Sequence, residues 1–134
     1  MPTTRRNFFK IIAALPLAAL FARPTPAAPL PPPARLLLNR FSIAGFQYCA
    51  GPALARRLRP GAELKLTPEP QNPHDPFAVE IHLGQAKLGY VPRSDNKHIS
   101  RLLEQGARLA CRVVEVDPAA AVWRRVRVEV IIEV

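Results

Sequence analysis

The feature that most restricts the fold of this chain is a loop segment, residues 69–79, in which proline recurs at every third position (70, 73 and 76). Each proline fixes its own φ angle and favours extended backbone in the residue before it. Asn72 and Asp75 each precede a proline, and both residue types hydrogen-bond nearby backbone in Asx turns. We therefore expect a stiff loop that holds Asn72, His74 and Asp75 in one orientation.

An alternating pattern follows this loop directly, with apolar residues at 77, 79, 81 and 83. This period of two predicts a strand with one buried face. Gly84-Gln85 forms a tight turn, and residues 87–91 pair back as the second strand of a hairpin. A rigid polar loop mounted on a strand is suited to form a binding edge.

The other predicted elements are also mostly strands. Strands are expected at 36–48, with a bend at Gly45, and at 62–67, 108–116 and 126–134. A short helix is expected at 53–58, and a longer one is capped by Ser94 or Asp95 and ends at Gly106. Five or six short strands with one or two short helices predict a mainly β fold, a small, closed or nearly closed OB- or SH3-like β-barrel. We expect one monomeric domain.

The N-terminus has the pattern of an export signal. Arg5 and Arg6 are followed by Phe8, Lys10 and an apolar run at 11–22, as in twin-arginine signal peptides. The run is too short for a membrane span of ~20 residues. We predict a signal at 1–27, a proline-rich linker at 28–35 and a domain at 36–134 that does not span a membrane. The protein is then periplasmic, or anchored to the inner membrane if the signal is kept; the alternative is a cytoplasmic protein with a basic amphipathic start.

Charge and cysteine content restrict the function less. The net charge of +9 falls to +5 without residues 1–27, which hold four basic residues and no acidic ones. A basic domain suits an anionic partner, although this charge alone indicates only solubility. Cys49 and Cys111 would form one disulfide in an oxidising compartment, or Cys111 is simply a small buried residue.

No pattern in the sequence indicates an enzyme. No serine lies in a nucleophile elbow, and there is no glycine-rich phosphate loop with its lysine. The histidines and cysteines lack the close ligand pairs of a structural zinc site. We therefore predict a binding domain without catalysis, cofactor or metal.

Three features indicate what the domain binds. Arg93, Lys97 and Arg101 are four residues apart, so on a helix they form a basic ridge beside its N-terminus; the alternative is an ordinary solvated face. Tyr48 and Tyr90 lie on predicted strands near loop ends, where bases stack on such rings, or they are half-buried in the barrel. The third feature is the polar loop, whose Asx turns serve either recognition or only architecture.

Three blocks of the sequence resemble the signature blocks of the HIRAN domain family: residues 45–48 (GFQY), 69–79 (EPQNPHDPFAV) and 88–93 (LGYVPR). The resemblance covers roughly residues 36–134. It implies a small β-barrel with accessory helices. Family members in eukaryotic remodelling ATPases capture the free 3′ end of single-stranded DNA, so the resemblance implies a non-catalytic nucleic-acid-binding module. The alternative is a periplasmic adaptor that binds a protein or another anionic ligand through the same groove.

The resemblance also implies roles for individual residues. Tyr48 would stack on a base, Asp75 would accept a hydrogen bond from the 3′-hydroxyl, and Arg93 would hold a phosphate. Asn72 and His74 would line the same pocket. The chain departs from the DNA-binding members at three positions: Gln47 replaces an arginine, His74 a tyrosine and Tyr90 a histidine. Because phosphate neutralisation supplies most nucleic-acid affinity, we expect weak and salt-sensitive binding.

Overall fold

The computed structural model describes residues 23–134, and the compact unit begins at Pro33. Most of the predicted signal peptide lies outside the described residues. Residues 23–34 are exposed and carry no regular secondary structure. In the described part of the chain, no helix has the length and apolarity needed to cross a membrane.

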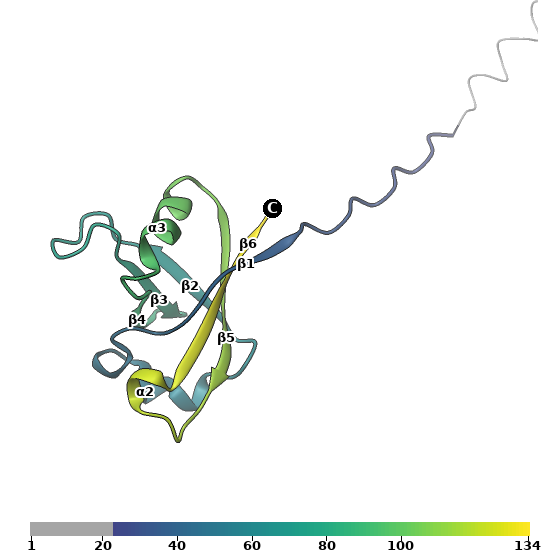
Figure 1. Ribbon diagram of the computed structural model, residues 1–134. Helices are drawn as coiled ribbons and strands as arrows, with labels where there is room; N and C mark the ends of the chain where they lie inside the picture. The colour runs from purple at the N-terminus through teal and green to yellow at the C-terminus, as the bar shows by residue number, and fades with distance from the viewer. Residues whose placement is uncertain (1–22) are drawn as a thin grey trace, which may run out of the picture. The chain divides into compact units, whose positions relative to one another are not determined.

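The compact unit is built on one antiparallel sheet of six strands in the order β1-β6-β5-β2-β3-β4 (Figure 1). The strands are β1 Arg35–Ser42, β2 Glu63–Pro68, β3 Val79–Leu83, β4 Ala86–Tyr90, β5 Arg108–Val116 and β6 Val126–Glu133. The prediction of a mainly β fold is confirmed. The sheet does not close into a continuous barrel, because its end strands β1 and β4 share no ladder; only the pair Ala44 and Tyr90 joins their two ends.

Short helices flank the sheet, with α3 and α2 at opposite ends of it in Figure 1. They are α2 Gly51–Leu54, α3 Asn96–Glu104 and the 3₁₀ segments η2 Phe46–Tyr48, η3 Ala55–Arg57 and η4 Val122–Arg124. In α3, Ile99 is fully buried and Leu103 packs against the core, as its apolar spacing predicts. Asp95 occupies the N-cap position, as one of the two predicted residues, but its side chain makes no capping hydrogen bond; its carboxylate instead accepts hydrogen bonds from Asn39 and Ser94.

The first strand is shorter than predicted, and the reason is Gly45. Its φ of +69° is a left-handed conformation, after which the chain turns into η2. Strand β1 therefore ends at Ser42, and Tyr48 lies in a 3₁₀ turn and not on a strand. This exit from the sheet places the segment after β1 beside β4.

A second glycine permits that close crossing. Gly89 has a φ of +152°, and a Cβ atom there would collide with the Ala44 carbonyl oxygen and the Ile43 side chain. Without a side chain at this point, two backbone hydrogen bonds form: Ala44 N–H to the Tyr90 carbonyl at 2.9 Å and Tyr90 N–H to the Ala44 carbonyl at 2.8 Å. The glycine of the LGYVPR block thus fixes the position of Tyr90 relative to Ala44.

Both cysteines are free thiols. Cys111 is buried in β5, and burial, with a smaller contribution from Glu129, raises the pKa of its thiol to about 12. Of the two interpretations of Cys111, the structure supports the small buried residue.

Candidate functional site

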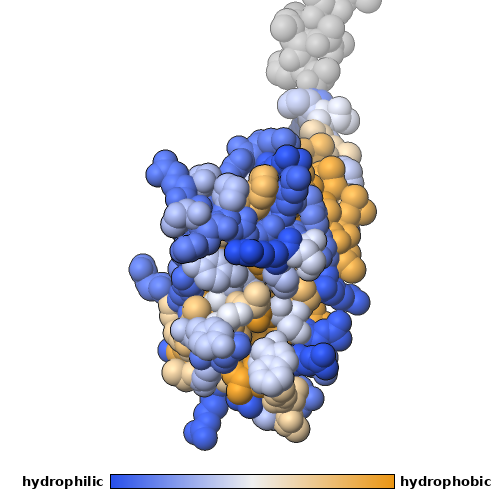
Figure 2. Space-filling view, turned by 60° about the vertical axis from the view of Figure 1, so that its left-hand side comes forward, coloured by the Kyte–Doolittle hydropathy of each residue, from blue (hydrophilic) through white to orange (hydrophobic). Residues whose placement is uncertain are grey.

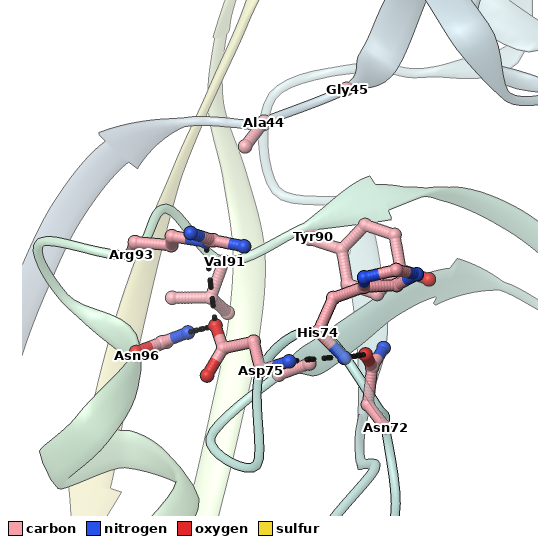
Figure 3. Close-up of a pocket in the computed structure, with 10 residues that line it drawn as sticks. Ala44, Gly45, Asn72, His74, Asp75, Tyr90, Val91, Arg93 and Asn96 are labelled. Atoms are coloured by element: carbon pink, nitrogen blue, oxygen red, sulfur yellow. Dashed lines mark hydrogen bonds and ion pairs between the residues drawn. The ribbon is translucent and has the colours of Figure 1, made fainter.

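A pocket of about 340 Å³ opens beside β4, where the proline loop, the segment after β1 and the start of α3 meet (Figure 3). Its lining residues are Ala44, Gly45, Asn72, His74, Asp75, Ala78, Tyr90, Val91, Arg93 and Asn96. Small apolar side chains form part of the wall, and the polar groups come from the loop and from the turn before α3. In Figure 3, Tyr90 and His74 lie on one side and Asp75, Arg93 and Asn96 on the other.

Asn72 has an architectural role in the proline loop. Its Oδ1 accepts hydrogen bonds from the backbone N–H groups of His74 at 2.9 Å and Asp75 at 3.2 Å. Its Nδ2 donates to the Glu69 carboxylate at 2.8 Å. These contacts occupy most of the hydrogen-bonding capacity of the amide. Asn72 therefore shapes the pocket wall and has little capacity left for a ligand.

Asp75 combines architecture with spare capacity. Its Oδ1 accepts a hydrogen bond from the Phe77 N–H at 2.9 Å, which closes an Asx turn, and its Oδ2 accepts one from Asn96 Nδ2 at 2.7 Å. Arg93 Nε lies 3.8 Å from the same Oδ2. Since each carboxylate oxygen has two acceptor sites, Oδ1 still has one for a ligand hydroxyl. The two interpretations of Asp75 are therefore compatible.

Arg93 supplies an exposed positive charge at the pocket. Its side chain is 77% exposed, and its ion pair with Asp75 is the one it makes within residues 23–134. A long contact through Nε leaves the terminal guanidinium nitrogens available to an anion. Arg93 lies in the turn before α3 and not on the helix, so the predicted helical ridge of three basic residues is wrong at its first member.

The remaining predicted site residues lie outside the pocket lining. Lys97 and Arg101 share one face of α3 and lie over the Phe77 ring, with their charges 5.4 and 5.5 Å from its centroid. Tyr48 is 85% exposed on η2, and its N–H donates to the carbonyl of the pocket residue Gly45. These three residues extend the surface next to the pocket.

Asn96 is the polar pocket residue that sequence reasoning missed. It is 3% exposed and donates to Asp75 from the first position of α3. Asparagine is common at helix starts because it caps the helix locally. The sequence therefore gave no sign that Asn96 contacts Asp75, 21 positions away. The neighbouring Ala44, Ala78 and Val91 gave no polar signal.

The fold and this pocket define a small β domain built for binding, and comparison with known proteins assigns its family. The family model of the HIRAN domain matches residues 38–134, so the chain belongs to the HIRAN domain family, which is associated with nucleic-acid binding and generally serves as a binding module. No curated protein matches the chain.

Two crystal structures are similar to the chain. One is of a protein from Lactobacillus plantarum, with a TM-score of 0.63, 27% identity, and coverage of 74% of this chain and 95% of that one. The other is the HIRAN domain of human HLTF, with a TM-score of 0.52, 14% identity, and coverage of 73% and 76%. The second likeness is one of fold.

Proposed function

We propose that this protein is a non-catalytic module that binds the free 3′ end of a single-stranded nucleic acid, DNA in the first place, in the pocket between the proline loop and β4. The observation that carries the proposal is the pairing of Asp75 and Arg93. A carboxylate with a spare acceptor site lies 3.8 Å from an exposed guanidinium, at the edge of an apolar pocket. A strand end offers a matching pair of groups, a hydroxyl donor and a phosphate.

The chemistry of these groups favours a hydroxyl end over a phosphorylated one. Asp75 Oδ1 would accept the hydrogen bond of the terminal hydroxyl, and Arg93 would bind the adjacent phosphate. A terminal phosphate would instead bring negative charge against the carboxylate. Tyr90 and His74 offer ring faces for the terminal base, and the pocket volume suits a single nucleotide.

The positive charge near the pocket is enough for weak binding of a nucleic-acid strand. Lys97 and Arg101 lie close to the loop through their contacts with Phe77, so they would neutralise phosphates further along the strand. Gln47 adds no charge where the DNA-binding relatives have an arginine. We expect dissociation constants in the micromolar range or weaker, which increase steeply with salt.

We also propose that the domain acts outside the cytoplasm, on the basis of the twin-arginine pattern at 1–27. Its ligand is then a strand end in the periplasm or on an exported assembly. A substrate that is exported in the folded state fits a domain whose two cysteines are both free thiols.

The test compares one oligonucleotide with a free 3′-hydroxyl and with a 3′-phosphate, by fluorescence anisotropy across a salt series. The protein should prefer the hydroxyl end, and Asp75→Ala should remove that preference. Asp117→Ala is the matched control, because Asp117 also accepts a backbone hydrogen bond two residues on (Ala119 N–H, 3.0 Å) but lies outside the pocket. Equal affinity for both ends, or tight binding that salt leaves unchanged, would contradict the proposal, and no binding of either strand would favour a protein ligand.

A further inference from the structure

A lysine lies directly behind the tyrosine of the pocket. Lys87 on β4 donates a hydrogen bond from Nζ to the Tyr90 hydroxyl oxygen at 2.6 Å. Its ammonium group is also 4.3 Å from the Tyr90 ring centroid. Tyr90 lines the pocket and Lys87 does not. Tyr90 is therefore the residue that connects the ammonium to the pocket.

The positive charge of Lys87 is only partly neutralised by its neighbours. Glu80 on β3 is the nearest carboxylate, with Oε1 3.7 Å from Nζ, but its other oxygen lies 2.5 Å from His82 Nε2. Glu80 is thus held more closely by His82 than by Lys87. The Tyr90 hydrogen bond, with help from Glu80, raises the pKa of Lys87, so the ammonium stays charged at neutral pH.

This arrangement fixes the direction of the hydrogen bonds at Tyr90. An ammonium group has three donors and no acceptor, so the tyrosine oxygen must accept from Lys87. The hydroxyl hydrogen of Tyr90 remains available, and a neighbouring cation polarises it and strengthens its donation to another acceptor. The best acceptor for such a donor is an anionic oxygen. In Figure 3, Tyr90 and Arg93 lie on different sides of the pocket.

We propose that Lys87 is a positioning residue that makes Tyr90 a phosphate donor, so that the last phosphodiester of a bound strand is held between Tyr90 and Arg93. This inference rests on the proposed function. It gives Tyr90 a hydrogen-bonding role in addition to stacking. Lys87 would also supply, from behind Tyr90, part of the positive charge that is missing at Gln47.

The experiment uses two single strands that differ only in their last internucleotide linkage, a phosphodiester or an uncharged methylphosphonate. The unsubstituted protein should bind the phosphodiester strand about tenfold more tightly, the fold-change expected from one charge-assisted hydrogen bond. Lys87→Met and Tyr90→Phe should each reduce this ratio several-fold, and the double variant should reduce it no further. Lys87→Arg should restore it.

Salt dependence separates a role in binding from a structural one. Lys87→Met should lower the slope of log affinity against log salt, but by less than the value of about 0.7 expected for one fully lost phosphate neutralisation, because Arg93 still contacts the same phosphate. Lys65→Met is the matched control, since this exposed lysine on β2 makes no contact with Tyr90, and it should leave the methylphosphonate ratio unchanged.

The outcomes distinguish this inference from the proposed function. If the protein prefers a 3′-hydroxyl end while Lys87→Met and Tyr90→Phe keep the parental ratio, the inference is wrong and the proposed function stands. An equal loss of the ratio in Lys65→Met would reduce the effect to general charge and would also overturn it. If no strand binds to the unsubstituted protein, both fail. Tyr90→Phe removes a single oxygen, so it remains a valid test should Lys87→Met fold poorly.

Discussion

Two carboxylates, Glu129 in the sheet and Asp75 in the proline loop, are held by similar groups but to different degrees. The Glu129 side chain is 7% exposed, and its two oxygens lie 2.5 Å from Arg112 Nε and 3.1 Å from Arg40 Nε. The Asp75 side chain is 16% exposed, and its close partners are a backbone N–H and the neutral amide of Asn96. Glu129 is fully paired with arginines, whereas Asp75 keeps one acceptor site and a loosely held cation.

This difference shows how one type of side chain serves two purposes in a small domain. Glu129 lies on β6, between β1 and β5, and each neighbouring strand contributes one arginine. Its contacts join three strands and leave nothing for a ligand. Asp75 is positioned by its loop and by α3, and Arg93 beside it is mostly exposed. The first carboxylate stabilises the sheet and the second is open to recognition.

Removing Glu129, the carboxylate that is fully paired with arginines, should have the largest effect on stability. Glu129→Ala removes two charge-assisted hydrogen bonds, and we expect a loss of about 3 kcal/mol in the free energy of unfolding, at about 1.5 kcal/mol for each because both arginines are half exposed. Urea denaturation measures it. Glu115→Ala, which removes an exposed ion pair with Arg127, is the control and should cost well under ~1 kcal/mol. A similar small cost for both variants would mean that Glu129 is not structural.

Asn96→Ala tests how much the amide of Asn96 contributes to holding Asp75 in place. The substitution removes a buried hydrogen bond to a charged group, so we expect a loss of about 2 kcal/mol of stability together with weaker strand binding. Asn39→Ala removes a similar 2.8 Å amide–carboxylate contact, to Asp95 outside the pocket. That control should lose stability but keep binding. If Asn96→Ala binds strands like the unsubstituted protein, Asp75 does not need this support for recognition.

The pH dependence of stability should reveal the lowered pKa of Glu129. The hydrogen bond from Arg112 lowers the pKa of Glu129, burial opposes this shift, and Arg40 adds to it. A carboxylate whose folded pKa is depressed stabilises the protein above its unfolded pKa of about 4.3, and this stabilisation disappears as pH falls through the folded value. The stability difference between the protein and Glu129→Gln, measured by urea denaturation, should therefore be constant near neutral pH and shrink under acid. A difference that grows on acidification would contradict the assigned direction.

Local patterns predicted the elements whose shape depends on nearby residues. The strand at Arg108–Val116, the turn at Gly84-Gln85 and the helix before Gly106 follow from alternation, turn chemistry and apolar spacing. The end of β1 was missed because Gly45 was interpreted as a bend within a longer strand, whereas its left-handed conformation turns the chain into η2. The burial of Glu129 was missed because its partners Arg40 and Arg112 come from different strands, far from it in the sequence.

The candidate site was predictable to the extent that it repeats the family signature. Asn72, His74 and Asp75 of the second block and Tyr90 and Arg93 of the third line one pocket. Lys97 and Arg101 lie on the surface beside the pocket and not in its lining. Tyr48 lies on η2, because the chain turns at Gly45. Figure 2 shows a face that is mostly hydrophilic in its upper half, with an apolar strip along its right-hand edge and mixed patches below, a distribution that no linear pattern indicated.

Arg93→Gln should have the smallest effect on stability, and it still distinguishes the role of Asp75 from that of Glu129. Because its side chain is 77% exposed and its ion pair is long, its loss should change the free energy of unfolding by less than about 0.5 kcal/mol. Strand binding should weaken, and the salt slope should fall by about 0.7 if one phosphate contact is lost. Arg35→Gln, which removes an exposed ion pair with Glu133, is the control and should leave both quantities nearly unchanged. An unchanged salt slope in Arg93→Gln would mean that the cation beside Asp75 only balances that carboxylate, as the arginines beside Glu129 do.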